Sequence, residues 1–153
     1  MSRLRLLVTA PLIASLAGIL PAIAAAEDPL PTGKLAVQVL GVQGTNGRVC
    51  VAIWDDPDSY PDEGKHARSS CAKAKDGKAY ITFKNLPPGA YAAFAFHDAD
   101  SNGKIKTNFI GMPKEGVGAS RGAKGFMGPP KFKDARFEVG TDRKFIQIRL
   151  KYL

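Results

Sequence analysis

The final segment of the chain, KFIQIRLKY (residues 144–152), alternates polar and apolar side chains. Strict alternation is typical of a β-strand with one buried face. It predicts an inward set of Ile146, Ile148, Leu150 and Tyr152 and an outward set of Lys144, Gln147, Arg149 and Lys151. Strand-like patterns recur in five earlier segments, residues 34–42, 44–55, 79–83, 91–97 and 135–140. Because helical periodicity is almost absent, we expect an all-β sandwich of about seven strands.

Turn signals between these segments predict how the strands connect. Asn46-Gly47 suits a tight hairpin turn, so the first two strands are expected to pair with each other. Leu86-Pro87-Pro88-Gly89 predicts a turn between the third and fourth strands. Residues 56–77 are polar and contain two prolines. They are expected to form a loop, with one short helical turn near residues 67–74.

Residues 1–26 have the pattern of a cleaved signal peptide. Arg3 and Arg5 precede an apolar stretch that ends in Ala24-Ala25-Ala26. The alternative is a retained membrane anchor, but proline and glycine interrupt the apolar run, which is shorter than the roughly 20 residues that span a bilayer. The mature chain, residues 27–153, is expected to be one β-sandwich domain without a transmembrane segment, located in the periplasm or secreted.

Cys50 and Cys71 are the two cysteines of the chain. In an exported protein an even number of cysteines predicts a disulfide bond. This bond would tie the loop of residues 56–77 to the second strand. A metal-binding pair is the alternative, but neither a CxxC spacing nor a histidine partner supports it.

The basic residues of the mature chain are concentrated in one segment. Removal of residues 1–26 takes away two arginines and lowers the formal charge from +8 to +6. Between residues 104 and 136, eight basic residues stand against Glu115 and Asp134 alone. The eight are Lys104, Lys106, Lys114, Arg121, Lys124, Lys131, Lys133 and Arg136. Such a segment can attract an anionic component of the cell envelope, and the alternative is a solvated face without a partner. Nucleic acid is not an expected partner, because basic and aromatic residues do not interleave regularly.

Residues 108–136 are rich in glycine and proline and show little periodic pattern. Long connections of this kind are usually binding loops or disordered segments. Its apolar residues argue that it packs across the sandwich. They are Phe109, Met112, Pro113, Phe126, Met127, Pro129, Pro130 and Phe132.

Four motifs follow one another in the second half of the chain. They are LPPGAYA (Leu86–Ala92), HDADSNGKIKTN (His97–Asn108), GMPKEGVGAS (Gly111–Ser120) and PPKFKDA (Pro129–Ala135). This succession resembles the bacterial family called domain of unknown function 2141, over most of the mature chain. The resemblance implies an exported protein with a transthyretin-like or immunoglobulin-like β-sandwich, and it implies no particular activity. Lys106 departs from the family pattern, which has Asp at this step.

The second motif also matches the first half of a helix-flanked calcium loop. Ligand positions are taken by Asp98, Asp100 and Asn102, with Gly103 at the sharp bend and the carbonyl of Lys104 after it. The second half of the pattern fails, because Lys106 and Phe109 stand where oxygen ligands are needed. Asn108 or Glu115 could substitute. The alternative is that the Asp and Asn side chains form Asx turns without metal. We expect calcium to bind weakly or not at all, and we expect no other cofactor.

Signals for catalysis are weak. His97 beside Asp98 could be a metal ligand or a general base, but a hydrogen-bonded structural histidine is commoner. Ser120 lies in GAS, without the turn motif that presents a nucleophilic serine. We therefore expect the protein not to be an enzyme, and a hydrolase built on His97, Asp98 and Glu115 is the least favoured alternative.

The leading hypothesis is an exported, non-enzymatic cell-envelope binding or accessory module that uses the loop surface of residues 97–136. Candidate binding residues on this surface are His97, Asn108, Lys114, Glu115, Ser120 and Arg121. The alternative is a calcium-stabilised, adhesion-like module that holds its ion with Asp98, Asp100, Asn102 and Lys104.

Overall fold

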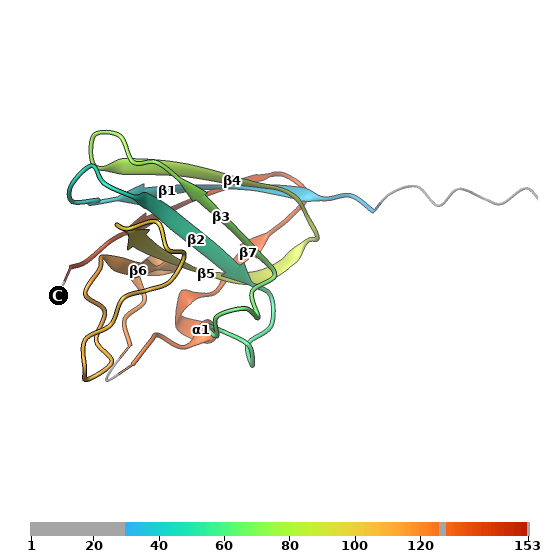
Figure 1. The fold of residues 1–153 in the computed structure, drawn as a ribbon. Coiled ribbons are helices and arrows are strands. Elements are labelled where there is room, and N and C mark those ends of the chain that lie inside the picture. The colour runs from blue at the N-terminus through green and yellow to red at the C-terminus, as the bar shows by residue number, and fades with distance from the viewer. Residues whose placement is uncertain (1–29, 126–127, 153) are drawn as a thin grey trace, which may run out of the picture.

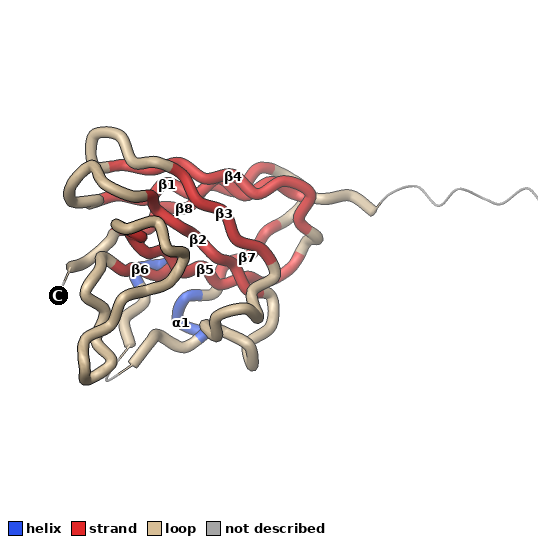
Figure 2. The backbone as a smooth tube through the Cα atoms, in the orientation of Figure 1, coloured by secondary structure: helices blue, strands red, loops and turns tan. Residues whose placement is uncertain are grey.

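The computed structural model describes residues 30–125 and 128–152, and the predicted signal peptide, residues 1–26, lies outside them. The described chain is nearly all β-structure (Figure 2). Its strands are β1 (Gly33–Leu40), β2 (Arg48–Trp54), β3 (Arg68–Ala72), β4 (Lys78–Leu86), β5 (Gly89–Asp98), β6 (Val117–Ala119), β7 (Phe137–Val139) and β8 (Arg143–Arg149). A 3-10 turn, η1 (Ser120–Gly122), and a short helix, α1 (Phe132–Ala135), lie between β6 and β7.

The strands form the two sheets of a sandwich (Figure 1). One sheet has the order β4-β1-β8, in which β1 is antiparallel to β4 and parallel to β8. The other has the order β3-β2-β5-β6, and β7 pairs with the first residues of β5. The predicted all-β sandwich is confirmed.

Two apolar clusters hold the fold together. The larger lies between the sheets and takes alternate residues of β1, β2, β4 and β5. The smaller lies on the other face of the β3-β2-β5-β6 sheet and consists of Trp54, Tyr60, Ala92, Ala119, Phe132 and Ala135. Strand β5 therefore contributes to both clusters, which explains why small alanines fill it.

The alternation in the last strand is confirmed at most positions. Ile148 and Leu150 are buried, whereas Ile146 and Tyr152 are half-buried against the main core. The predicted outward residues are exposed, namely Lys144, Gln147, Arg149 and Lys151. The final strand thus faces the core as the sequence predicts.

The predicted hairpin between the first two strands is wrong, because β1 and β2 lie in different sheets. Gly47 does have a positive φ of 72°. Gly47 does not form a hairpin turn between β1 and β2. It lies against the end of β5, where a Cβ atom would collide with the carbonyl oxygen of Asp98. Glycine is therefore needed for the close approach of this segment to the end of β5.

The predicted helical turn near residues 67–74 is also wrong, because residues Arg68–Ala72 form β3, antiparallel to β2. All residues of β3 except the last are exposed, so this edge strand lacks the apolar alternation that identifies strands in a sequence. Cys50 lies opposite Cys71 in this pairing, and the two form a disulfide bond. The predicted disulfide is confirmed.

The glycine-rich segment of residues 108–136 is partly ordered into β6, η1 and α1. Phe132 is buried, as expected for a segment that packs on the sandwich. The expectation is wrong for Phe109 and Met112, which are 99% and 43% exposed. Phe126 and Met127 lie outside the described residues. Within residues 30–125 and 128–152, no helix is long and apolar enough to span a membrane.

Candidate functional site

The candidate site lies where β5 ends and the chain turns into residues 99–116. His97 and Asp98 are the last residues of β5, so their side chains point to opposite faces of the sheet. The chain then makes a turn and a narrow hairpin, residues 106–114, which returns to β6. In Figure 1 this hairpin projects beyond the sheets, on the side on which α1 lies.

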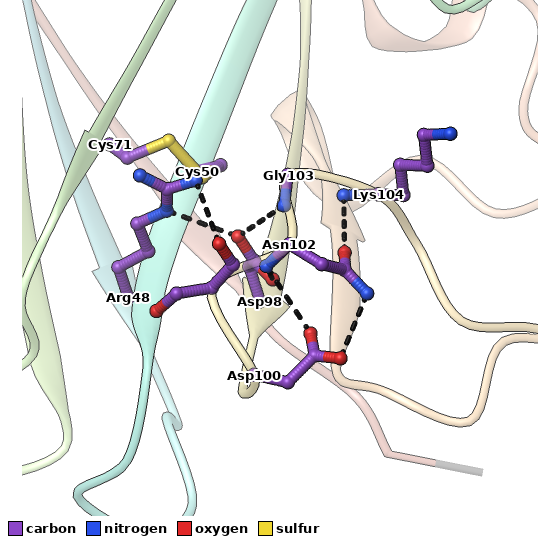
Figure 3. Close-up of a disulfide and its surroundings, with 9 residues drawn as sticks. Arg48, Cys50, Cys71, Asp98, Asp100, Asn102, Gly103 and Lys104 are labelled. Carbon is purple, nitrogen blue, oxygen red and sulfur yellow. Dashed lines mark hydrogen bonds and ion pairs between the residues drawn. A yellow bond between two sulfur atoms is a disulfide. The ribbon is translucent and has the colours of Figure 1, made fainter.

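Asp98 organises the turn that follows β5. Its side chain is completely buried. One oxygen, Oδ1, accepts the Asn102 N–H at 2.9 Å. The other, Oδ2, accepts the Gly103 N–H at 2.9 Å and the Arg48 Nε–H at 3.0 Å (Figure 3). Hydrogen bonds from a cation and two backbone amides offset the cost of burying a carboxylate.

Asp100, Asn102 and Lys106 also stabilise this turn, through hydrogen bonds and an ion pair. The Asn102 side chain donates to Asp100 Oδ2 at 2.8 Å and accepts the Lys104 N–H at 2.7 Å. The Lys106 ammonium lies 2.7 Å from the same Asp100 oxygen. This hydrogen bond lowers the pKa of Asp100 and raises that of Lys106. The geometry is that of Asx turns closed by an ion pair.

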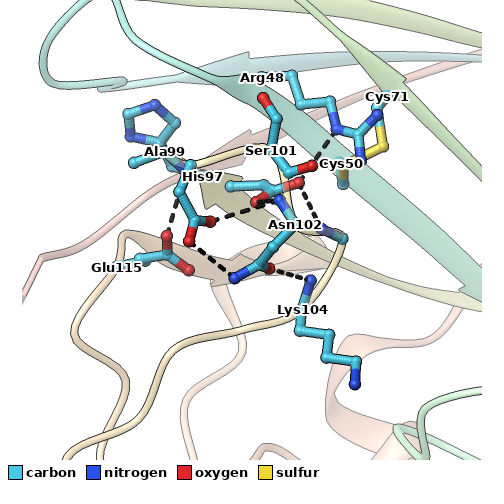
Figure 4. A network of polar contacts seen from close by, with 12 residues as sticks. Arg48, Cys50, Cys71, His97, Ala99, Ser101, Asn102, Lys104 and Glu115 are labelled. Atoms are coloured by element: carbon cyan, nitrogen blue, oxygen red, sulfur yellow. Dashed lines mark hydrogen bonds and ion pairs between the residues drawn. A yellow bond between two sulfur atoms is a disulfide. The ribbon is translucent and has the colours of Figure 1, made fainter.

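Glu115 fixes the hairpin to the end of β5. The residue is buried. Its Oε1 accepts the Ala99 N–H at 3.1 Å (Figure 4). Its Oε2 accepts the Lys106 N–H at 3.1 Å. One carboxylate therefore joins the first residue after β5 to the first residue of the hairpin.

Carboxylate oxygens of Asp98, Asp100 and Glu115 lie within 4.8 Å of one another, as a cation site requires. Both oxygens of Asp98 and of Glu115, however, already accept backbone N–H groups. Lys106 places its own positive charge on Asp100. Asp98 Oδ1 and both oxygens of Glu115 each keep a further lone pair besides the one that accepts the N–H group. The Lys106 ammonium on Asp100, however, opposes a second positive charge at this position.

His97 points away from this cluster and toward the β1-β4-β8 side of the sandwich (Figure 4). Its Nε2 lies 2.8 Å from the carbonyl oxygen of Asn46, and its Nδ1 lies 2.9 Å from the Tyr152 hydroxyl. The carbonyl only accepts, which assigns a proton to Nε2. The Tyr152 hydroxyl accepts the Gln43 N–H and can donate to Nδ1. Both ring nitrogens are thus occupied by structural partners.

Ser120 and Arg121 differ in exposure. The buried Ser120 hydroxyl accepts the Ala93 N–H at 3.0 Å and donates to the carbonyl of Ala135, so it joins β5 to α1. Arg121 is exposed and has a positive φ of 59°. Its guanidinium donates to the Arg136 carbonyl at 3.3 Å.

The tip of the hairpin carries the residues that the sequence interpretation did not single out as a site. Phe109 is 99% exposed and Ile110 is 67% exposed. The Asn108 carbonyl accepts the Gly111 N–H at 3.0 Å, which makes residues 108–111 a β-turn with the two apolar side chains at its central positions. The signal that could have revealed it is the adjacent apolar pair between an Asn and a Gly, which are turn formers.

The candidate binding residues of the sequence interpretation therefore fall into two groups. His97, Glu115 and Ser120 are buried and hold the backbone in place. Asn108 is half-buried, and its side chain accepts N–H groups of the tip itself. Lys114, like Arg121, is exposed and available to a partner.

A model of the family described as "Uncharacterized protein conserved in bacteria (DUF2141)" matches residues 37–147. No curated protein matches the chain. A solved structure of a pilus-presented adhesin (Cpa) is similar to it, with 15% sequence identity and a TM-score of 0.28. The likeness covers 80% of this chain and 27% of the adhesin. At this TM-score it carries no argument about fold or function.

Proposed function

The chain belongs to the bacterial family called domain of unknown function 2141, and we propose that it is an exported, non-enzymatic module that binds an anionic component of the cell envelope. The contact surface is the hairpin of residues 106–114 together with the basic residues around it. The observation that carries the proposal is the exposed apolar pair Phe109 and Ile110 on a turn that is tied down at its base.

A single exposed apolar side chain is common on protein surfaces. Two adjacent ones at the end of a projecting turn, followed by Met112 at 43% exposure, form a small apolar tip instead. The fold uses two buried carboxylates, Asp98 and Glu115, to hold the segment that leads to this tip. This arrangement supports a role in which the tip is presented to a partner.

The charge around the tip supports an anionic partner. Lys104 and Lys114 flank the hairpin and are exposed. Further along the same loop surface, Arg121 and Lys124 are exposed as well. Long-range attraction by these cations would raise the rate of encounter with a negatively charged surface and would weaken as salt is added.

The Cys50–Cys71 disulfide supports export, because disulfides persist in oxidising compartments such as the periplasm or the extracellular medium. The hydrogen bonds of the polar residues support a non-enzymatic role. His97 and Ser120, the candidates for a base and a nucleophile, are buried and bonded to structural partners. The calcium-stabilised alternative rests on the three converging carboxylates, which Lys106 already neutralises in part.

The test is co-sedimentation of the protein with separated envelope fractions, one of membranes and one of polysaccharide. The test variant replaces both tip residues, Phe109→Ser and Ile110→Ser. The control variant carries Tyr80→Ser and Phe145→Ser, two side chains that are 64% and 53% exposed on the outer face of the β4-β1-β8 sheet. Both variants remove two exposed side chains with large apolar surface, and the control also loses the hydrogen bond that the Tyr80 hydroxyl accepts from Gln38.

We expect the parent and the control variant to bind one of the fractions and the tip variant to bind at least about tenfold more weakly, because burial of each side chain contributes roughly 1.5–3 kcal/mol. Circular dichroism melting checks that both variants fold. Equal binding of the parent and the tip variant to every fraction would contradict the proposed contact surface.

A further inference from the structure

We infer that the anionic component is the surface of a lipid bilayer, into which Phe109 and Ile110 insert while Lys104 and Lys114 contact phosphate headgroups. This inference rests on the proposed function and names its partner. It follows from the shape of the tip, from the hydrogen bonding of its backbone and from the charges beside it.

The tip is convex and offers its partner only apolar side chains. Phe109, at 99% exposure, touches almost nothing of its own chain. Phe109, Ile110 and Met112 have no side-chain group that can form the hydrogen bonds needed to recognise a sugar. A bilayer needs no pocket, because lipid chains deform around an inserted side chain, and the interfacial region accepts apolar groups from a protein that lies on the surface.

The backbone N–H groups that follow Phe109 in the tip are hydrogen-bonded within the turn. Asn108 Oδ1 accepts the N–H groups of Ile110 at 3.0 Å and of Met112 at 2.9 Å. The Asn108 carbonyl accepts the Gly111 N–H. Three consecutive amides, at residues 110–112, therefore have partners within the turn. An unsatisfied amide would oppose insertion, because a backbone polar group that loses water without a partner is costly.

The Asn108 N–H in turn donates to the Met112 carbonyl at 2.8 Å, and the Lys114 N–H donates to the Lys106 carbonyl at 2.8 Å. These bonds make the hairpin a defined ladder rather than an open loop. Ordering the tip before it meets the bilayer reduces the entropy lost on binding.

The charges beside the tip distinguish an anionic bilayer from a neutral one. Lys104 and Lys114 are exposed, and neither forms an ion pair with a residue that the structure describes. The Lys104 side chain points away from Asp98 and Asp100 (Figure 3). Lys106 is not counted, because it is paired with Asp100. One lysine near an anionic membrane surface strengthens binding about fivefold. Two lysines together with the apolar pair Phe109 and Ile110 would therefore attach the protein to the bilayer reversibly.

The experiment compares vesicles of phosphatidylcholine alone with vesicles that contain about 30 mol% phosphatidylglycerol, which carry a negative surface potential. Binding is measured by co-sedimentation. Insertion is measured with Phe109→Trp, whose fluorescence emission should shift to shorter wavelength when the tip enters the bilayer. Trp54, the single native tryptophan, is 4% exposed and far along β2 from the tip, so the parent protein serves as the baseline. Tyr80→Trp is the matched control at an exposed position on the other sheet.

We expect binding to the anionic vesicles, little binding to the neutral ones, and a blue shift for Phe109→Trp but not for Tyr80→Trp. Phe109→Ser with Ile110→Ser should weaken vesicle binding at least about tenfold. Lys104→Gln with Lys114→Gln should weaken it by roughly tenfold or more and should reduce its salt dependence.

Three results would overturn the inference. If the protein ignores anionic vesicles but binds the polysaccharide fraction in a way that the tip variant loses, the bilayer is the wrong partner and the proposed function stands. If the protein binds vesicles but Phe109→Trp shows no blue shift and the tip variant binds as well as the parent, insertion is wrong. Failure to bind either vesicles or any envelope fraction would overturn both the inference and the proposed function.

Discussion

The ammonium group of Lys106 lies 2.7 Å from the carboxylate of Asp100, at the step where a calcium loop would place an oxygen ligand. Asp98 and Glu115 on either side of this pair accept backbone N–H groups with both of their oxygens. The turn after β5 is therefore closed by the chain's own donors and by its own cation.

The first prediction concerns calcium. Because binding stabilises a protein only when free ligand exceeds the dissociation constant, we expect the melting temperature of the parent to stay unchanged at about 0.1 mM calcium. Lys106→Asp adds a fourth acidic side chain to the cluster of Asp98, Asp100 and Glu115 and removes the cation. This variant should melt lower than the parent in chelator and regain stability when calcium is added.

The matched control for this prediction is Lys106→Gln, which removes the cation without adding a carboxylate and should not respond to calcium. Differential scanning calorimetry after chelator treatment makes the comparison. A rise in the melting temperature of the parent at about 0.1 mM calcium would contradict the account and favour a metal-stabilised module.

The second prediction concerns Asp98. Asp98→Asn replaces an acceptor oxygen by a donor NH2 group that must face an N–H group or Arg48. We expect the free energy of unfolding to fall by about 2–4 kcal/mol, because buried donors and a cation lose their partner. Urea titration measures the change. Asp58→Asn, at an exposed aspartate, is the control and should change stability by less than about 0.5 kcal/mol.

The third prediction separates local from global stability. Glu115→Gln removes one acceptor from the bridge between Ala99 and Lys106. Amide hydrogen exchange of residues 106–114 should become faster, while exchange in β1 and β2 stays close to that of the parent, because the hairpin opens without unfolding the core. If the protection factors in the hairpin are unchanged, Glu115 does not hold it.

The fourth prediction concerns Tyr60, whose buried hydroxyl has no hydrogen-bond partner among the described residues. Burial raises the pKa of Tyr60 from 10.0 to about 12. Near neutral pH, Tyr60→Phe should leave stability unchanged or raise it, because the hydroxyl is buried without compensation. Loss of the proton becomes favourable in the unfolded chain first, so the parent should lose stability between pH 10 and about 12.

Tyr60→Phe has no hydroxyl to ionise. Its stability relative to the parent should therefore increase as the pH rises from 10 to about 12. Lysines titrate in both proteins, so the difference between the two is the informative quantity. Tyr80→Phe, at an exposed tyrosine, serves as the control. A variant that melts well below the parent at neutral pH would show that the Tyr60 hydroxyl has a partner.

The sequence predicts the strands whose apolar residues alternate against the main core. It does not predict contacts between segments that are distant in the chain. Cys71 lies in an exposed edge strand, whose residues carry no apolar signal. Gly47 is an ordinary turn signal in the sequence, but its requirement comes from the backbone of Asp98, which is distant in the chain. Local patterns cannot reveal either relationship.

In the candidate site, too, the sequence predicts the local features and misses those that depend on distant segments. The Asx turns of Asp98, Asp100 and Asn102 follow from short-range spacing and are one of the two alternatives that the sequence predicts. The roles of Glu115 and His97 depend on partners in other segments, so the sequence only marked these residues as chemically capable. The sequence predicts burial of Phe109, because phenylalanine side chains are usually buried, whereas the structure exposes it.

The central claim is that the hairpin of residues 106–114 is the surface that meets the partner. Hydrogen–deuterium exchange of the protein bound to its envelope fraction or to anionic vesicles, compared with the free protein, tests it most directly. The account predicts slower exchange in residues 104–114 on binding and no change in β4 and β8, whose outer face carries Tyr80 and Phe145. Slower exchange in β4 and β8 with none in residues 104–114 would contradict it.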